Sequence, residues 1–301
     1  MSVPQIDPTV PSAAVSYREY TLGAPLDCFV ECVWFAAQRG LSAPVQRIPP
    51  DGCMEAILHL GASFGQVENG RVVEQPSQFL VGVWTGPIAL AAPATYETIG
   101  IRFRPGCAQL FVAAPASAFT NRVVDLHHVW GAGAASLGQE LGDTRSDSAR
   151  VSVVRRFLLA RLQPNDPLVG RSIARILETR GRVTIDALAQ RSGASHRHIE
   201  RAFLTIVGVP AKTLCRIVRF QNVLRHVAHG SEAEPKNAAA WADIAVACGY
   251  ADQSHLIRDF SQLAGETPRQ LVAASDALAA YFRTASRLRR LFRATELSSH
   301  A

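Results

Sequence analysis

The sequence has 301 residues, of which 48% are hydrophobic and 19% charged, and its formal net charge is +6. This length accommodates one large domain or two of ordinary size, and the composition excludes a low-complexity or disordered chain. Six cysteines are too sparse for a disulfide scaffold. No basic segment leads into an apolar core near the N-terminus, and three prolines interrupt the uncharged stretch 75–96. We therefore expect a cytoplasmic protein without a signal peptide or a membrane partner.

Charge is distributed unevenly along the chain. The first 150 residues contain 9 Arg, no Lys and 13 acidic side chains, whereas the remainder contains 22 basic and 12 acidic side chains. An acidic front half joined to a basic back half indicates a polyanion-binding module attached to a second domain.

The front half has the pattern of a β domain. Residues 1–16 contain three prolines and are expected to form a loose terminus. Strands are predicted at 53–60, 64–67, 72–73, 79–84, 88–91 and 98–103, with a hairpin turn at Asn69-Gly70. In the last of these strands, Ile99, Ile101 and Phe103 share one face, while Arg102 and Arg104 point to the other. The expected fold class is therefore α+β, with a mainly antiparallel β domain over 17–145.

After Pro105-Gly106 the pattern becomes helical and stays so to the end of the chain. Residues 146–166 are expected to form a connector helix and a linker. An all-α domain follows over 167–272, and 273–301 are expected to form a basic amphipathic helix. That last helix could dock on its own domain, pair with a second protomer or contact phosphates.

The helical half contains an internal repeat. Its first copy reads Leu188-Ala189, Ser192-Gly193, Ile199-x-Arg201-x-Phe203 and Gly208; its second reads Ile244-Ala245, Cys248-Gly249, Leu256-x-Arg258-x-Phe260 and Gly265. The copies are 56 residues apart before the turn and 57 after it, which places a one-residue insertion in the turn. Each copy has the form of a helix-turn-helix, a short helix and an amphipathic helix around a glycine-containing turn.

Local chemistry supports both units. Thr184, Ser195 and Asp252 stand where helix N-caps are expected. Because the apolar stripes contain Ile199 and Phe203 in one unit and Leu256 and Phe260 in the other, the opposite faces are expected to be exposed. Between the units, 212–229 are predicted to form one long helix that ends near Gly230.

The second copy carries the most specific signature. Ile244-Ala245-x-x-Cys248-Gly249-Tyr250-x-Asp252-x-Ser254-His255-Leu256-x-Arg258-x-Phe260, closed by Gly265-x-Thr267-Pro268, resembles the AraC/XylS family of bacterial transcription regulators. The resemblance covers about 168–271. Two features depart from the family pattern: Leu271-Val272 replace an aromatic residue and Arg, and Pro210 stands one place early. Segments of the front half, among them 50–55 and 100–106, resemble an uncharacterised domain found ahead of such regulators.

The resemblance implies two recognition helices that read adjacent major-groove segments of double-stranded promoter or operator DNA. Arg197, Arg201 and Arg258 match positions that face bases in the family. Further base-reading candidates, chosen because their side chains can contact base edges, are Glu200, Gln253, Ser254 and Ile257. Contacts to phosphates are expected near Thr184, Ser195, Lys212, Arg216 and Asp252, partly through backbone amides at helix N-termini. RNA polymerase, a small-molecule effector and a second copy of the chain are further expected partners, and the chain could act as activator or repressor.

Purely structural roles are alternatives for several of these residues. Arg201 and Arg258 could be structural ion-pair partners, and Glu200 could be a simple surface residue. Arg102 and Arg104 could bind an anionic effector or form salt bridges across a sheet face. No nucleotide-binding loop or metal-ligand spacing is present, so neither enzymatic activity nor a cofactor nor a metal is expected. The alternatives are an enzyme or DNA-repair protein that the helical domain targets to DNA, and a nonspecific architectural binder.

Overall fold

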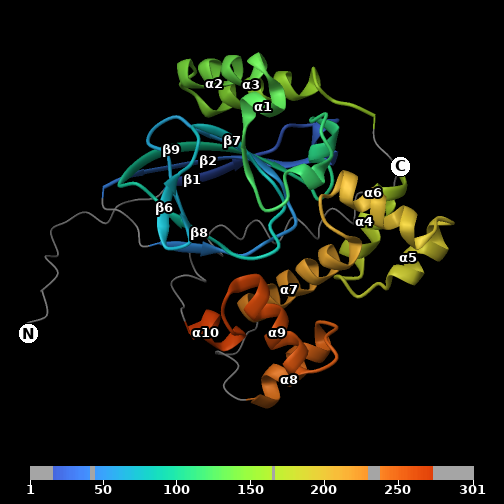
Figure 1. The fold of residues 1–301 in the computed structure, drawn as a ribbon. Coiled ribbons are helices and arrows are strands. Elements are labelled where there is room, and N and C mark those ends of the chain that lie inside the picture. Colours follow the sequence, from blue (N-terminus) through green and yellow to red (C-terminus); the bar gives the residue numbers. More distant parts are fainter. Residues whose placement is uncertain (1–15, 41–44, 165–166, 230–237, 274–301) are drawn as a thin grey trace, which may run out of the picture.

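The computed structural model describes residues 16–40, 45–164, 167–229 and 238–273 (Figure 1). The front half contains two sheets whose strands all pair antiparallel. The strands are β1 (Ser16–Tyr20), β2 (Val30–Arg39), β3 (Gln46–Ile48), β4 (Glu55–His59), β5 (Gly65–Glu68), β6 (Arg71–Glu74), β7 (Gln78–Val81), β8 (Ile88–Ala91), β9 (Thr95–Phe103) and β10 (Val123–Asp125). The larger sheet has the order β1-β2-β9-β4-β7-β10, and the smaller one β3-β8-β5-β6. The predicted antiparallel β domain is confirmed.

Two sequence features determine the local shape of the sheets. Asn69 and Gly70 both have positive φ, 50° and 77°, and close the predicted hairpin between β5 and β6. In β9, Ile99, Ile101 and Phe103 are fully buried, and Arg102 between them is buried as well. The expectation that only helices follow residue 106 is wrong, because β10 returns to pair with β7. That short strand carries no periodicity of its own and is held by the sheet edge.

Three helices cover the outer face of the larger sheet, α1 (Leu126–Trp130), α2 (Ala132–Asp143) and α3 (Asp147–Leu159) (Figure 1). Three short 3-10 turns each bury at least one apolar side chain: η1 (Leu26–Cys28), η2 (Ala108–Leu110) and η3 (Ala116–Ala118). Helix α3 is anchored by charge as well as packing, since Arg18 and the Tyr20 hydroxyl both donate to Asp147.

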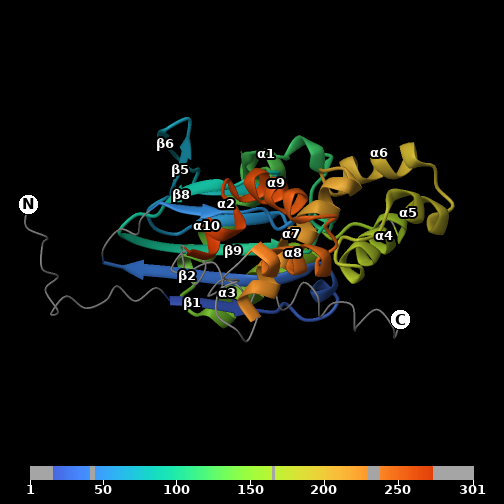
Figure 2. The same ribbon diagram turned by 90° about the horizontal axis from the view of Figure 1, so that it is seen from below.

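The rest of the chain is helical, as predicted. Its helices are α4 (Pro167–Glu178), α5 (Ile185–Ser192), α6 (His196–Ile206), α7 (Ala211–His229), α8 (Ala238–Ala247), α9 (Gln253–Ala264) and α10 (Pro268–Ala273). The pairs α5–α6 and α8–α9 are the two helix-turn-helix units, and α7 is the long helix that joins them (Figures 1 and 2). The predicted helix at 273–301 falls almost wholly outside the described residues.

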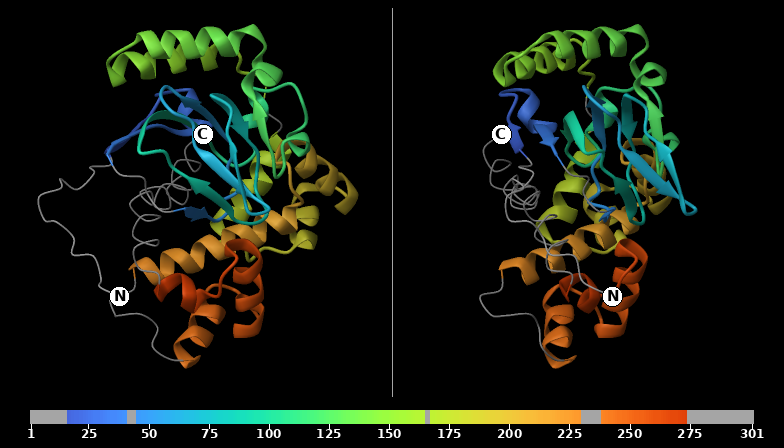
Figure 3. Two further views of the ribbon diagram at one scale, coloured as in Figure 1. Left: turned by 60° about the vertical axis from the view of Figure 1, so that its left-hand side comes forward. Right: turned by 90° about the vertical axis from the view of Figure 1, so that its left-hand side faces the viewer.

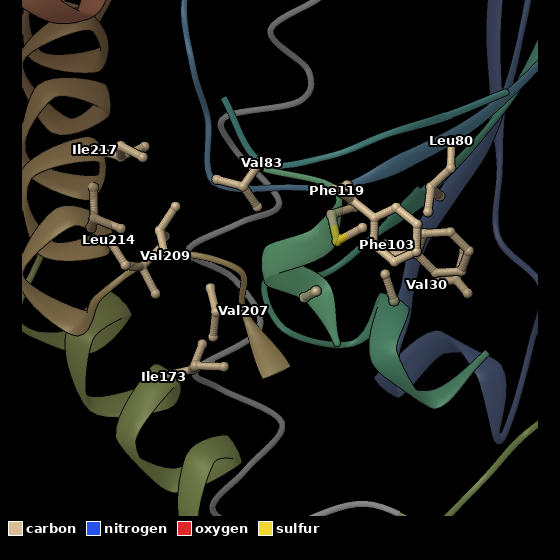
Figure 4. Close-up of a cluster of buried hydrophobic side chains, with 14 of the residues drawn as sticks. Val30, Leu80, Val83, Phe103, Phe119, Ile173, Val207, Val209, Leu214 and Ile217 are labelled. Carbon is tan, nitrogen blue, oxygen red and sulfur yellow. The ribbon is translucent and has the colours of Figure 1, made fainter. Parts of the chain in front are cut away.

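The two halves share one apolar core. Val83 and Phe119 of the β domain belong to the same cluster as Val207, Val209 and Leu214 of the helical domain (Figure 4). Helix α7 lies between the sheets and the second unit (Figure 3). Polar contacts reinforce the boundary: Thr120 Oγ1 donates to the Gly208 carbonyl at 2.6 Å, and Gln221 Nε2 donates to the Pro50 carbonyl at 2.6 Å. The helical domain therefore rests on the β domain through a buried interface.

Candidate nucleic-acid interface

The first unit is built as its sequence predicts. The Thr184 hydroxyl accepts from the Ala187 amide and caps α5, and the Ser195 hydroxyl accepts from the His198 amide and caps α6. Between the helices, Gly193 has a φ of 65°, the left-handed conformation that ends α5. These caps fix where α6 begins and hence which of its residues face outward.

Helix α6 presents a polar face to solvent. Ile199 and Phe203 are buried, whereas Arg197, Glu200 and Arg201 are all exposed. Among the described residues, no carboxylate lies within ion-pair distance of either arginine. Their guanidinium groups are thus available for an external acceptor, such as a guanine edge or a phosphate.

The second unit repeats this construction. The Asp252 carboxylate accepts from the His255 amide at 2.7 Å and caps α9, and Leu256 and Phe260 are buried beneath it. On the opposite side, Ser254 and Arg258 are exposed, while Gln253 and Ile257 are half-buried. Arg258 Nε reaches the Ser254 carbonyl one turn earlier, at 3.4 Å. Both units therefore offer an exposed polar helix face in matching positions.

The predicted phosphate contacts differ in character. Lys212 is exposed at the start of α7. Arg216 instead binds Asp259 through Nε at 2.9 Å and through a terminal nitrogen at 2.8 Å, and it also contacts Gln262. Asp259 is buried, so this pair ties α7 to α9. Arg216 therefore has a structural role in attaching the second unit to α7, in addition to its predicted phosphate contact.

A basic cluster of Arg180, Arg182 and Arg225 lies where the two units meet, and it was not among the predicted site residues. Arg180 and Arg182 are exposed on either side of Gly181, just ahead of the Thr184 cap. The Arg182 side chain crosses Gly249 in the turn of the second unit, where a Cβ would come within 2.5 Å of it. Burial, together with the charge of Arg180, lowers the pKa of Arg225 to about 10. The sequence feature that indicates this cluster is the pair Arg180 and Arg182, which flank Gly181 shortly before the Thr184 N-cap.

Arg102 and Arg104 lie away from these helices. Arg102 is 1% exposed, and it binds Glu31 at 3.0 Å and also Asp51 and Glu55. Arg104 donates to the Asp27 carbonyl at 2.9 Å. The salt-bridge alternative is confirmed for Arg102. The expectation that Arg102 binds an anionic effector directly is corrected, because three carboxylates already surround its guanidinium.

A cavity of about 150 Å³ lies between the two sheets. Its walls come from β2, β4, β7, β8 and β9 and from the segment 48–53. They include Trp34, Phe64 and Trp84 beside Asp51 and Glu55. A concave, mostly apolar space with a few polar groups is the usual form of a small-molecule site. No local sequence pattern indicates this cavity, because its lining residues come from segments far apart in the chain.

Two family models match the chain. Residues 18–125 match DUF6597, a domain of unknown function, and residues 188–274 match HTH_18, a helix-turn-helix domain. No curated relative matches the sequence. Within the described residues, no group of three or more His, Cys, Asp or Glu side chains is placed to hold a metal ion. None of the described helices combines the length and apolar character needed to cross a bilayer.

Several solved structures show a distant likeness. ToxT from Vibrio cholerae is 10% identical with a TM-score of 0.43, over 77% of this chain and 97% of that chain. An unsaturated fatty acid-bound ToxT from the same organism is 9% identical with a TM-score of 0.41, over 89% and 97%. The AraC-like transcriptional activator CuxR is 14% identical with a TM-score of 0.31, over 75% and 86%.

Proposed function

Because the chain joins a DUF6597 domain to an AraC-type helix-turn-helix domain, we propose that it is a sequence-specific DNA-binding transcription regulator. Helices α6 and α9 read adjacent major-groove segments of one duplex. The observation that carries this proposal is the pair of matched units, each with a capped second helix whose polar face is exposed. A nonspecific binder would not need two different exposed faces.

The spacing of the units suits one side of a duplex. Helix α7 has 19 residues, which corresponds to a length of about 28 Å. Successive major-groove segments are about 34 Å apart, so a rod of this length is of the right order to separate two recognition helices. The Arg216–Asp259 pair and the Phe220–Phe260 ring contact hold α9 on that rod. A single protomer therefore reads a non-palindromic site.

Each side chain has a proposed role. Arg197, Arg201 and Arg258 would donate to guanine, Glu200 would accept from cytosine, and Ile257 would pack on a thymine methyl group. Gln253 and Ser254 are adaptable polar readers. Backbone amides next to the Thr184, Ser195 and Asp252 caps, with Lys212 and the exposed Arg180 and Arg182, would hold phosphates.

The cavity gives the β domain a means of regulating DNA binding. Its lining includes Pro50 and Asp51, and the Pro50 carbonyl accepts from Gln221 of α7. The neighbouring Gly52 lies against Leu214 on the same helix, where a Cβ would come within 2.9 Å of Leu214 Cδ1. A small effector that shifts the segment 50–52 would thus act directly on the helix that spaces the two units.

The test is the variant Arg258→Ala, measured on DNA selected from a random pool by the wild-type protein. Loss of a base contact should cost about 1–3 kcal/mol and relax the base preference in one half of the site. Arg71→Ala is the matched control, since Arg71 is an exposed arginine on β6, outside the helical domain. Equal affinity and unchanged base preference for Arg258→Ala would contradict the assigned reading role. Failure of the wild-type protein to enrich any sequence would overturn the proposed function.

A further inference from the structure

The cavity between the sheets has an uneven charge environment. Among the described residues, Glu31, Asp51 and Glu55 all bind the single guanidinium of Arg102. Asp51 and Glu55 line the cavity, with side chains 20% and 13% exposed, whereas Glu31 does not line it and its side chain is 1% exposed. Burial raises the pKa of Glu31, which favours its neutral form. Asp51 and Glu55 present carboxylates at the cavity wall, and such acidic groups favour a positively charged guest over an anionic one.

Aromatic rings form much of the remaining wall. Trp34, Phe64 and Trp84 line the space, together with Ile48, Ile57 and Leu90. Trp34 is held rigidly, because its indole packs against Gly100, where a Cβ would come within 2.0 Å, and its Nε1 donates to Glu55 at 3.3 Å. Aromatic faces attract cations and planar rings alike. The wall chemistry is therefore that of a site for an aromatic compound that carries positive charge.

Two buried polar atoms at this wall lack partners within the described part of the chain. Trp84 Nε1 and His59 Nε2 make no hydrogen bond, although His59 Nδ1 is paired with Thr98 Oγ1 at 2.9 Å. Burial lowers the pKa of His59. Buried groups of this kind are normally satisfied, and unsatisfied ones at a cavity wall mark where a ligand or an ordered water binds.

We propose that this cavity binds a small aromatic cation, a single-ring compound with a protonated amine, whose ammonium group lies against Asp51 and Glu55. The size agrees: a cavity of about 150 Å³ is the volume that accommodates a benzene ring in an engineered protein core. The ring occupies the space among Trp34, Phe64 and Trp84. This inference rests on the proposed function, in which the cavity is the effector site of the regulator.

The experiment uses the full chain and three probes of the same size and different charge. Benzylamine, benzyl alcohol and benzoate are titrated in turn by isothermal calorimetry without DNA. Benzylamine should bind at least about tenfold more tightly than benzyl alcohol, and benzoate should bind most weakly. Comparable binding of all three, tighter binding of benzoate, or no binding of any probe would each overturn the proposal.

A substitution series locates the site. Glu55→Gln should weaken benzylamine by about tenfold and leave benzyl alcohol within about twofold. Glu74→Gln, which removes an exposed carboxylate of β6, should change neither. Trp84→Phe replaces the indole with a smaller ring and removes its N–H, so it tests the contact between this side chain and the probe. Because Trp84 is not part of the Arg102 cluster, this variant keeps the test possible if Glu55→Gln folds poorly. It should weaken benzylamine and benzyl alcohol in parallel, and unchanged affinity for both would place the probes elsewhere.

DNA binding is measured separately by fluorescence anisotropy. Benzylamine binding without any sequence-specific DNA binding would overturn the proposed function and leave the ligand site standing. Sequence-specific DNA binding without benzylamine binding would overturn only the ligand assignment.

Discussion

Replacing Arg102 with methionine tests how much the buried guanidinium stabilises the β domain by pairing with three carboxylates. The substitution keeps most of the side-chain volume and removes the charge. Glu31, Asp51 and Glu55 would then repel one another without a partner. Breaking a buried ion pair by removing one member costs about 3–5 kcal/mol. Because Asp51 and Glu55 are 20% and 13% exposed and retain some solvent contact, we expect the lower end, about 3 kcal/mol.

The assay is urea unfolding of the full chain, followed by circular dichroism. A loss of about 3 kcal/mol should appear as a lower urea midpoint with an unchanged dependence of the unfolding free energy on urea concentration. Arg104→Met is the matched control, since Arg104 makes one described hydrogen bond, to the Asp27 carbonyl, and should cost about 1 kcal/mol.

The effect of Arg102→Met should depend on pH. The folded state raises the pKa of Glu31 through burial, so Glu31 stabilises the fold most below its unfolded pKa and loses that contribution as pH rises through its folded pKa. Without Arg102 the folded pKa rises further. The deficit relative to wild type should therefore be largest at about pH 8 and shrink toward about pH 5. A deficit below about 1 kcal/mol with a flat pH profile would refute this reasoning.

Three further predictions concern the helical domain and its support. Gly208→Ala should destabilise the chain by at least about 1 kcal/mol in urea unfolding, because Gly208 has a φ of 91° and a Cβ would lie 3.0 Å from the Ala116 carbonyl oxygen; an unchanged midpoint would argue against that contact. Ser195→Ala removes the hydroxyl that accepts from the His198 amide and should cost about 1 kcal/mol in the same assay, with Ser195→Asp restoring it. Lys212→Ala should weaken binding to all DNA sequences alike and lower the slope of log affinity against log salt by about one, and a loss confined to one sequence would exclude a phosphate contact.

The helices of the second half could be predicted from the sequence because their caps and apolar stripes involve residues close together in the chain. The caps at Thr184, Ser195 and Asp252 and the apolar stripes through Phe203 and Phe260 each depend on residues within a few turns of one another. Hence the two units, their spacing helix and the exposure of Arg197 and Arg258 were predictable. The hairpin at Asn69-Gly70 was predictable for the same reason.

The sites that depend on distant residues were not predictable. Arg102 finds Glu31, Asp51 and Glu55 only when β2 and β4 pair on either side of β9. Strand β10 exists because β7 offers it a partner. The cavity, likewise, is a space between two sheets and corresponds to no motif.

The amino-acid sequence by itself determined that this chain carries two helix-turn-helix units with exposed arginines, since caps, glycine turns and helical periodicity act over short distances. Only the tertiary structure decided that the β domain has an acidic, aromatic cavity and that Gln221 of α7 reaches the cavity segment at Pro50. Those relations join residues up to 171 positions apart, and the packing of the two halves, rather than any local preference, brings them together.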